Sequence, residues 1–245
     1  MALADCRIPY ALLRHTKDIW LRDFMPIRLP TGAFLSCRYE PGYLQKTPEL
    51  ITRYRQDIAP MLKLPVSYSR LRVDGGNILF SPNGSRVIVS DRVFIENPTY
   101  RRAEIVRELE NILCSQIIVI PSLKSDLTGH ADGMVRFLDE HTVIGNHTCF
   151  KNGLEQRIKR VLQNHGIDVI DFPYAAVHRG ISAVGIYLNY LETKRYVFFP
   201  IFGLKTDEDA VKEAREILAK PLISINAREI ARDGGGLHCI SWETE

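Results

Sequence analysis

The sequence predicts a mixed α/β fold built from repeated units, each combining strands with one helix. Three observations support this fold class. Helix signals begin near residues 47, 99, 154 and 206, at intervals of about 50 to 55 residues. Short β-branched or apolar runs lie between them, and five polar motifs recur at a similar spacing. A period that extends over the whole chain is typical of a repeat architecture such as a propeller.

Four segments carry the helix signals. Residues 47–61 open with Thr-Pro-Glu, a cap residue followed by a proline and an acid, which predicts a helix there. An amphipathic period predicts further helices over residues 99–113 and 154–165. Acidic residues at 207–209 predict the start of a fourth helix, because the helix dipole favours negative charge in the first turn.

Strands are predicted where β-branched or apolar runs are bounded by Gly, Pro, Asn or Asp. These runs are VIVS (87–90), IIVI (117–120), VIGN (143–146), YVFF (196–199) and LISI (222–225). Five units arranged radially would each bring one polar motif to a common axis.

The polar motifs follow the spacing of the units. They are WLRD (20–23), DGGN (74–77), GHADG (129–133), YLN (187–189) and GLHC (236–239). Positions 23, 74, 130, 189 and 239 are separated by 51, 56, 59 and 50 residues. Each motif alone is compatible with an ordinary turn or loop, since Asp and Gly-Gly are common turn residues. Together they supply a thiol, a histidine and three carboxylates at equivalent positions, which favours one composite site.

Composition excludes several classes of protein. The 245 residues are 45% hydrophobic, enough to bury a core, and we expect a single domain over residues 1–245. A net charge of +3 with scattered basic residues argues against a nucleic-acid partner. We expect no membrane partner either, because neither an apolar stretch of about 18 residues nor a secretory signal is visible. Five distant cysteines without a CxxC pair predict free thiols in a reducing cytoplasm and no zinc site.

Read in order, WLRDFMP, DGGN, TGHADGMVRF, IYLNY, FFPIFG and INAREIARDGGGLHCIS closely resemble the motifs of the agmatine deiminase and bacterial-type peptidylarginine deiminase family. The resemblance runs from about Asp18 to Trp242, and GHxDG and GGGxHC are its most specific parts. It implies the fold of the guanidine-modifying superfamily, a five-bladed pseudo-symmetric propeller of ββαβ units.

Family members carry a further segment before WxRD, whereas 19 residues precede Trp20 here. We therefore expect the first blade to be incomplete at the N-terminus and to lack its helix. Uncovered strands recruit a partner surface. Either a homo-oligomer interface or a longer natural start is expected to cover that blade.

The resemblance implies catalytic roles for three residues. Cys239 attacks the guanidinium carbon as a thiolate and forms a covalent S-amidino intermediate. His130 protonates the leaving nitrogen and then activates water, while Asp74 hydrogen-bonds and orients His130. If its thiolate is activated, Cys239 is the cysteine that iodoacetamide labels first.

The resemblance also implies substrate-binding roles. Asp23 and Asp132 grip the planar guanidinium through its N–H edges, as carboxylates pair with arginine. Trp20 and Asn189 line the substrate channel. Glycine tolerates positive φ, so a glycine-rich loop lets the backbone turn and the thiol face the site. That loop consists of Gly234, Gly235 and Gly236.

The implied function is hydrolysis of agmatine or a related alkylguanidine to a ureido product and ammonia, without a metal or organic cofactor. Peptidylarginine or free arginine is the alternative substrate. Agmatine ends in an amine and needs acidic or aromatic walls, whereas the carboxylate of arginine usually recruits an arginine such as Arg14, Arg179 or Arg232. A third reading, from another class, is a shortened relative that acts as a binding or scaffold protein. Retention of the cysteine, the histidine and the three acids weighs against it.

Overall fold

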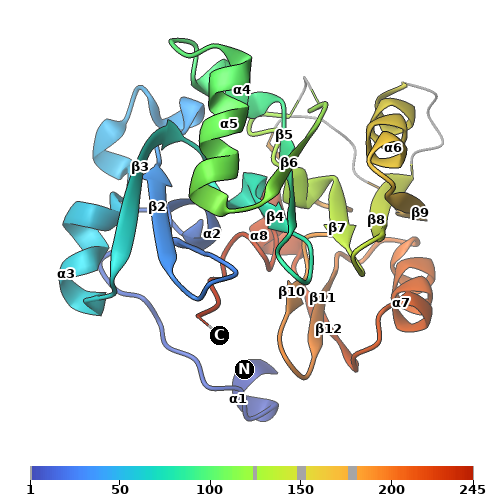
Figure 1. The fold of residues 1–245 in the computed structure, drawn as a ribbon. Helices are drawn as coiled ribbons and strands as arrows, with labels where there is room; N and C mark the ends of the chain where they lie inside the picture. Colours follow the sequence, from blue (N-terminus) through green and yellow to red (C-terminus); the bar gives the residue numbers. More distant parts are fainter. Residues whose placement is uncertain (1, 124–125, 148–152, 176–180, 245) are drawn as a thin grey trace.

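The fold contains four units of one ββαβ pattern (Figure 1). The computed structural model describes residues 2–123, 126–147, 153–175 and 181–244. In each unit the first two strands are antiparallel, and the second pairs in parallel with the third after a crossover. The strands are β1 (Ile27–Arg28), β2 (Phe34–Arg38) and β3 (Val66–Arg72); β4 (Leu79–Phe80), β5 (Arg86–Ser90) and β6 (Gln116–Ile120); β7 (Val135–Phe137), β8 (Thr142–His147) and β9 (Asp168–Pro173); β10 (Leu191–Glu192), β11 (Val197–Ile201) and β12 (Leu222–Asn226).

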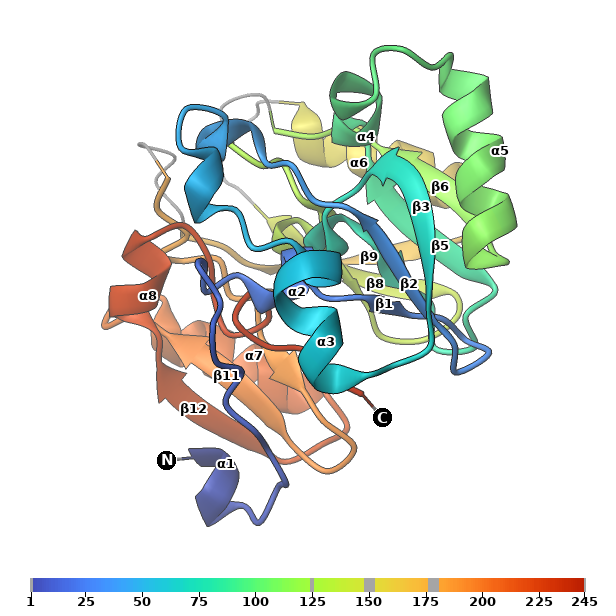
Figure 2. The same ribbon diagram turned by 90° about the vertical axis from the view of Figure 1, so that its left-hand side faces the viewer.

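The crossovers carry the main helices, which lie around the outside of the sheets (Figures 1 and 2). In chain order they contain α3 (Ala59–Leu62), α4 (Arg92–Glu96) with α5 (Arg102–Leu113), α6 (Leu154–Asn164) and α7 (Asp207–Ile217). Outside the crossovers lie α1 (Ala2–Asp5), α2 (Leu21–Phe24) and α8 (Arg228–Arg232).

Three of the four predicted helices are confirmed as α5, α6 and α7, but the prediction of one helix over residues 47–61 is wrong. That stretch is divided into η2 (Pro48–Leu50), the π-helical turn η3 (Tyr54–Ile58) and α3. Ile51 and Arg53 have extended backbone, and this stretch interrupts the predicted helix after η2. Residues 54–62 are helical without a break, and Pro60, which has no N–H to donate to the preceding turn, explains why that turn is π-helical instead of α-helical.

The five predicted strands are confirmed as β5, β6, β8, β11 and β12. The first strands of the units were not predicted, and neither were β2, β3 and β9. Two or three residues, as in β4 or β7, are too few to show the alternation on which a sequence-based prediction depends.

Apolar clusters pack each sheet against its helix and join neighbouring units. The cluster under α5 includes Leu35 of the first unit, and the cluster under α6 includes Leu79 of the second. In the same way, Ile144 of the third unit belongs to the cluster around α7. Neighbouring units therefore share a core, which fixes the positions of the loops that begin them.

The described residues outside the four units lie mainly at the two ends of the chain. The described terminal segments contain only the short helix α1 and no strand; they are residues 2–20 and 240–244. Both ends lie on the lower side of the molecule in Figure 1, between the sheet of β1–β3 and the sheet of β10–β12. An interface that covers this region stays a prediction.

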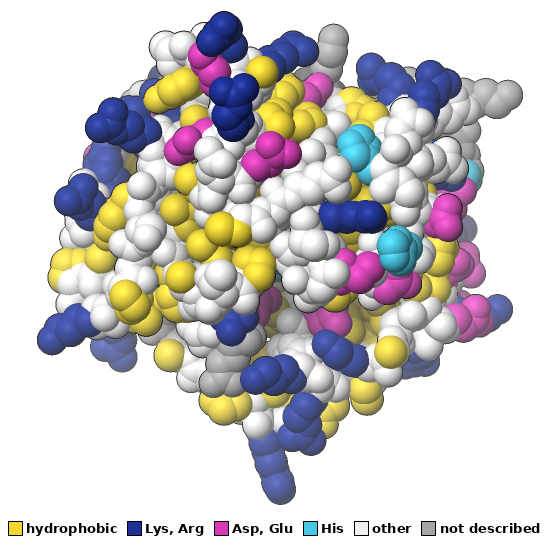
Figure 3. Space-filling model, in the orientation of Figure 1, with side chains coloured by type: hydrophobic (Ala, Val, Ile, Leu, Met, Phe, Trp, Pro, Cys, Tyr) yellow, Lys and Arg dark blue, Asp and Glu magenta, His cyan; other side chains and the backbone are white. Residues whose placement is uncertain are grey.

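Charged side chains of both signs are interspersed on the face seen in Figure 3. None of the helices in the described part of the chain combines the length and the apolar character needed to cross a membrane.

Candidate active site

Four of the five polar motifs come directly before the first strand of a unit, and the fifth, GLHC, follows α8 near the C-terminus. Asp23 lies in α2, before β1, and Asp74 caps the turn η4 (Gly75–Asn77) before β4. His130 caps the turn η5 (Ala131–Gly133) before β7, and Asn189 precedes β10. Because the units repeat, these segments meet: α2 packs against η4, and η4 against η5. The structure thus brings the predicted residues to one place.

His130 lies between two carboxylates. Its Nε2 is 3.1 Å from Oδ2 of Asp74, and its Nδ1 is 3.5 Å from Oδ1 of Asp23. Burial alone would lower the pKa of His130, but the charges of Asp23 and Asp74 outweigh it and raise this pKa well above the ordinary value. The imidazole is therefore protonated at neutral pH and can act as an acid.

The carboxyl group of Asp23 has a strongly shifted pKa. Burial raises the pKa of Asp23 to about 7, although the cation of His130 opposes the shift. Its Oδ1 accepts a hydrogen bond from the backbone N–H of Gly76 at 3.0 Å. Asp23 and Asp74 both contact His130, so the division of roles between them rests on the shorter distance to Asp74.

A second group surrounds Asp132. Oδ2 of Asp132 lies 2.7 Å from Nδ1 of His238 and accepts a hydrogen bond from Nδ2 of Asn189 at 3.2 Å. The sulfur of Cys239 is 3.9 Å from the same oxygen. Burial would raise the pKa of Asp132, yet its contact with His238 and the nearby positive charges lower it, so the group is ionised.

The thiol of Cys239 is only 9% exposed. Burial, together with the charges of Asp132 and Asp23, raises the pKa of Cys239 well above the ordinary value. Cys239 is therefore a neutral thiol, and the condition for labelling it first, an activated thiolate, is not met.

Asn189 fixes the loop that carries the thiol. Its Oδ1 accepts hydrogen bonds from the backbone N–H groups of His238 and Cys239, at 3.1 and 3.3 Å. The same amide binds Asp132, so one side chain sets the distance between carboxylate and sulfur. Its expected place in a channel wall stays a prediction.

The glycine-rich loop needs its glycines for different reasons. Only Gly234 of the three has a positive φ, +111°. A Cβ on Gly235 would lie 2.3 Å from the Trp20 ring, and one on Gly236 would lie 2.6 Å from Oδ1 of Asn189. Close approach, and not only backbone freedom, therefore explains the run of glycines. Trp20 lies against the loop that ends in Cys239.

Sequence reasoning missed three residues near this cluster. His238 was visible beside Cys239 but received no role. Arg22 donates through Nε to the His238 carbonyl at 3.4 Å and pairs with Glu243. Glu96, paired with Arg92 at 3.2 Å, has its pKa raised to about 7 by burial and by the charge of Asp74. Only the tertiary fold brings Glu96 near Asp74, so no sequence signal could have identified it.

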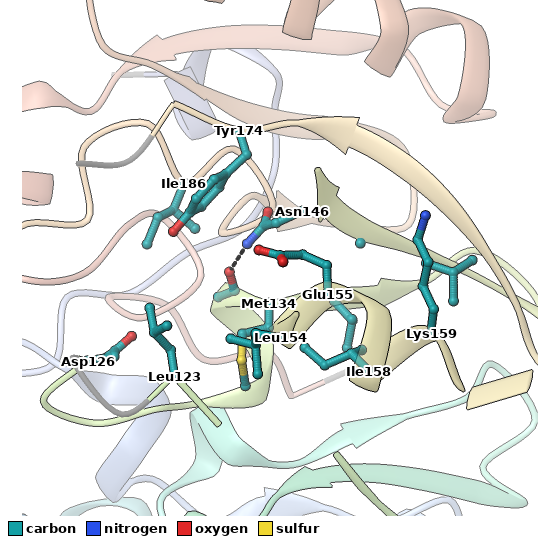
Figure 4. Close-up of a pocket in the computed structure, with 14 residues that line it drawn as sticks. Leu123, Asp126, Met134, Asn146, Leu154, Glu155, Ile158, Lys159, Tyr174 and Ile186 are labelled. Carbon is teal, nitrogen blue, oxygen red and sulfur yellow. Dashed lines mark hydrogen bonds between the residues drawn. The ribbon is translucent and has the colours of Figure 1, made fainter. Parts of the chain in front are cut away.

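A separate cavity lies beneath α6 and holds none of the predicted site residues (Figure 4). Its wall includes Leu154 and Ile158 of α6 and Gly133, whose carbonyl accepts a hydrogen bond from Asn146 at 2.6 Å.

Within the described ranges, no three His, Cys, Asp or Glu side chains are placed to hold a metal ion. The absence of a cofactor stays a prediction. Arg179 and Cys149 lie outside the described residues.

Solved structures share this fold over most of the chain. An agmatine deiminase of C. jejuni is 23% identical with a TM-score of 0.70, and covers 90% of this chain and 71% of its own. The agmatine deiminase of Enterococcus faecalis is 17% identical with a TM-score of 0.73, over 90% and 73%. DDAH from Pseudomonas aeruginosa is 15% identical with a TM-score of 0.62, over 98% and 82%. These matches confirm the predicted mixed α/β propeller fold.

Sequence comparison agrees with the structural matches. A Marinomonas protein assigned as an agmatine deiminase is 43% identical over 60 residues, which span 22% of this chain and 15% of that protein. The model of the Porphyromonas-type peptidyl-arginine deiminase family, whose members modify guanidino groups, matches residues 5–244. The predicted resemblance is therefore confirmed, and the chain belongs to the Porphyromonas-type peptidyl-arginine deiminase family.

Proposed function

We propose that this protein hydrolyses agmatine or a closely related alkylguanidine to a ureido product and ammonia. The observation that carries the proposal is the placement of the Cys239 sulfur 3.9 Å from the ionised carboxylate of Asp132, in a buried cluster with protonated His130. A planar cation fits such a cluster, because carboxylates pair with the N–H edges of a guanidinium.

The chemistry follows from the charges. The buried carboxylates oppose a thiolate at Cys239, and an incoming guanidinium reverses that effect by adding a positive charge beside the sulfur. Cys239 releases its proton to solvent, and the resulting thiolate attacks the central carbon to form a tetrahedral adduct. His130 donates a proton to the leaving nitrogen, which departs as ammonia, and the neutral imidazole then takes a proton from the attacking water. Hydrolysis of the S-amidino group yields the ureido product and restores the thiol.

Side chains beside the cluster favour a substrate tail that ends in an amine. Oδ2 of Asp18 accepts a hydrogen bond from the Tyr39 hydroxyl at 3.0 Å, and that hydroxyl lies 3.0 Å from the hydroxyl of Tyr43. Burial raises the pKa of Tyr43, and the charges of Asp23 and Asp18 add to the shift, so this network lies close to the guanidinium clamp. Acidic and aromatic groups suit a cationic amine.

Free or peptide-bound arginine is the second candidate substrate. Its carboxylate or carbonyl side would need a donor, and Arg14 is exposed while Arg232 pairs with Glu229 at 2.9 Å. Arg92 is a further candidate, because it pairs with Glu96 at 3.2 Å and Glu96 lies near enough to Asp74 and His130 to sense their charges. A Glu96→Gln variant releases Arg92 from its ion pair. If Arg92 binds the carboxylate of arginine, this variant shifts substrate preference from agmatine towards arginine.

The test is ureido-product formation from agmatine, free arginine, dimethylarginine and a blocked arginine peptide. We expect agmatine to give the highest kcat/KM, and Asp18→Asn to lower it for agmatine more than for methylguanidine, which has no tail. A higher kcat/KM for the arginine peptide would reject agmatine as the substrate. Lack of turnover with all four, in protein shown to be folded, would support the binding-protein alternative.

A further inference from the structure

His238 makes a shorter contact with Asp132 than Asn189 does. Its Nδ1 lies 2.7 Å from Oδ2 of Asp132, compared with 3.2 Å for the Asn189 amide nitrogen. The His238 and Asp132 side chains are 8% and 3% exposed. An ionised carboxylate can only accept hydrogen bonds, so Nδ1 carries the proton in this contact.

The histidine donates this hydrogen bond without adding a charge. Burial, with the nearby cations of Arg22 and Arg136, lowers the pKa of His238 to about 4, so the ring is neutral at pH 7. The Asn189 amide is neutral as well. Two neutral nitrogen donors, beside the more distant Cys239 thiol, thus hold one oxygen of Asp132 and leave its negative charge for a ligand. Among the described residues, Oδ1 of Asp132 has no hydrogen-bond partner.

The backbone of His238 is fixed as firmly as its ring. Its N–H lies 3.2 Å from the Asn189 carbonyl and 3.1 Å from Oδ1 of that residue. Its carbonyl accepts the hydrogen bond from Arg22, and the Arg22 backbone N–H donates to the Cys239 carbonyl at 3.0 Å. The residue therefore joins the thiol loop, Asp132 and the segment that precedes Asp23.

We propose that His238 is a positioning residue for the deimination proposed above: its Nδ1–H holds Oδ2 of Asp132, so that Oδ1 and the carboxylate charge face the guanidinium beside Cys239. This role rests on that proposed function, but it also predicts that the affinity for a guanidinium depends on His238. Loss of the donor frees the carboxylate to rotate and weakens the grip on the cation, while the thiol and His130 stay in place.

The experiment compares His238→Ala with His238→Asn. The Nδ2 of asparagine can occupy the place of the histidine Nδ1 and restore the donor, whereas alanine cannot. His165→Ala is the matched control, because that ring contacts the Val161 carbonyl at 2.8 Å, apart from the clamp residues. His238→Leu replaces the alanine variant if the latter does not fold, since leucine fills the space without a donor.

Two quantities are measured for each variant. The first is the Kd of methylguanidine by calorimetry in a Cys239→Ser background, which needs no turnover. The second is KM and kcat for agmatine with Cys239 present. We expect His238→Ala to raise Kd and KM roughly 10- to 100-fold, as for a lost hydrogen bond to a buried charge, with a smaller change in kcat. His238→Asn should stay within about threefold of the parent, and His165→Ala should change stability alone.

An unchanged Kd in folded His238→Ala, or equal weakening by asparagine and alanine, overturns the positioning role. If the parent releases no ammonia from agmatine while methylguanidine affinity still depends on His238, the proposed substrate is wrong and the positioning role stands.

Discussion

The His130 imidazole is 3.1 Å from Asp74 and is held in its protonated form by that carboxylate and by Asp23. Cys239, in contrast, is held as a thiol by the charges of Asp132 and Asp23. The cluster therefore combines a protonated imidazole with a neutral thiol. A guanidinium is the kind of ligand that changes this balance, because its charge offsets the carboxylates around the sulfur.

Cys239→Ser should abolish turnover. An alcohol at its ordinary pKa provides almost no alkoxide at neutral pH, and serine cannot replace the thiolate as nucleophile. Ammonia release from agmatine measures the effect, and Cys114→Ser, at an exposed position, is the control. If Cys239→Ser kept more than about a tenth of the parent activity, the covalent route would be excluded.

Iodoacetamide should modify Cys114 before Cys239 in the free protein. Cys114 is exposed, whereas Cys239 is buried and its pKa is raised by burial and by Asp132. Alkylation requires the thiolate, so both access and charge favour Cys114. Peptide mass spectrometry over a time course gives the order. Faster labelling of Cys239 at pH 7 would show that its thiolate already forms without substrate.

Substrate affinity should increase as the pH rises through about 7, the value to which burial raises the pKa of Asp23. Below that pH the Asp23 carboxyl is protonated and neutral, and above it the charge attracts the guanidinium. Calorimetry with agmatine on the Cys239→Ser protein, from pH 5.5 to 8.5, tests this dependence. Asp23→Asn should weaken it, because the amide cannot ionise, and Glu96, whose pKa is also raised to about 7, accounts for the dependence that remains.

Asp132→Asn should weaken agmatine binding by about 2 to 5 kcal/mol, the usual loss when one partner of a desolvated charge pair is removed. His130→Ala should instead stop the chemistry and leave affinity largely intact. Both variants are measured in the Cys239→Ser background, with His165→Ala as control. Equal affinity with and without the Asp132 carboxylate would reject the clamp.

The sequence was sufficient to predict the parts of the fold with strong local patterns. The amphipathic periods of α5 and α6 and the apolar runs of β5 and β8 are long enough to be recognised. The spacing of the five motifs predicted that Asp23, Asp74, His130, Asn189 and Cys239 share one site, because equivalent loops of a repeat meet at one end.

Features that do not follow from a periodic sequence pattern could not be predicted. The extended residues Ile51 and Arg53 and the π-helical turn before Pro60 were not visible beside the stronger start signal. Glu96 approaches Asp74 only through the packing of α4. The protonation states of Cys239 and Asp23 depend on burial, which a sequence pattern does not give. For these reasons the sequence indicated the residues of the site but not their charges.

Gly76 lies at the centre of the candidate site, and Gly76→Ala should inactivate the protein without unfolding it. A Cβ there would lie 2.8 Å from Oδ1 of Asp23, 2.8 Å from Nδ1 of His130 and 3.3 Å from Oδ2 of Asp132. At least one of these side chains must move, and a shift of about 1 Å in a catalytic group can lower the rate roughly 100-fold.

The matched control for this change is Gly42→Ala, where the added Cβ would lie 3.7 Å from Nη2 of Arg92, an ordinary contact. We expect Gly42→Ala to keep kcat/KM within about twofold, and Gly76→Ala to lower it at least about tenfold while both variants keep the parental circular dichroism spectrum. The glycine pair of DGGN is a common turn signal, so a turn alone would tolerate alanine at 76, where φ is not positive. Undiminished kcat/KM in Gly76→Ala would mean that Asp23, His130 and Asp132 do not act together around this point.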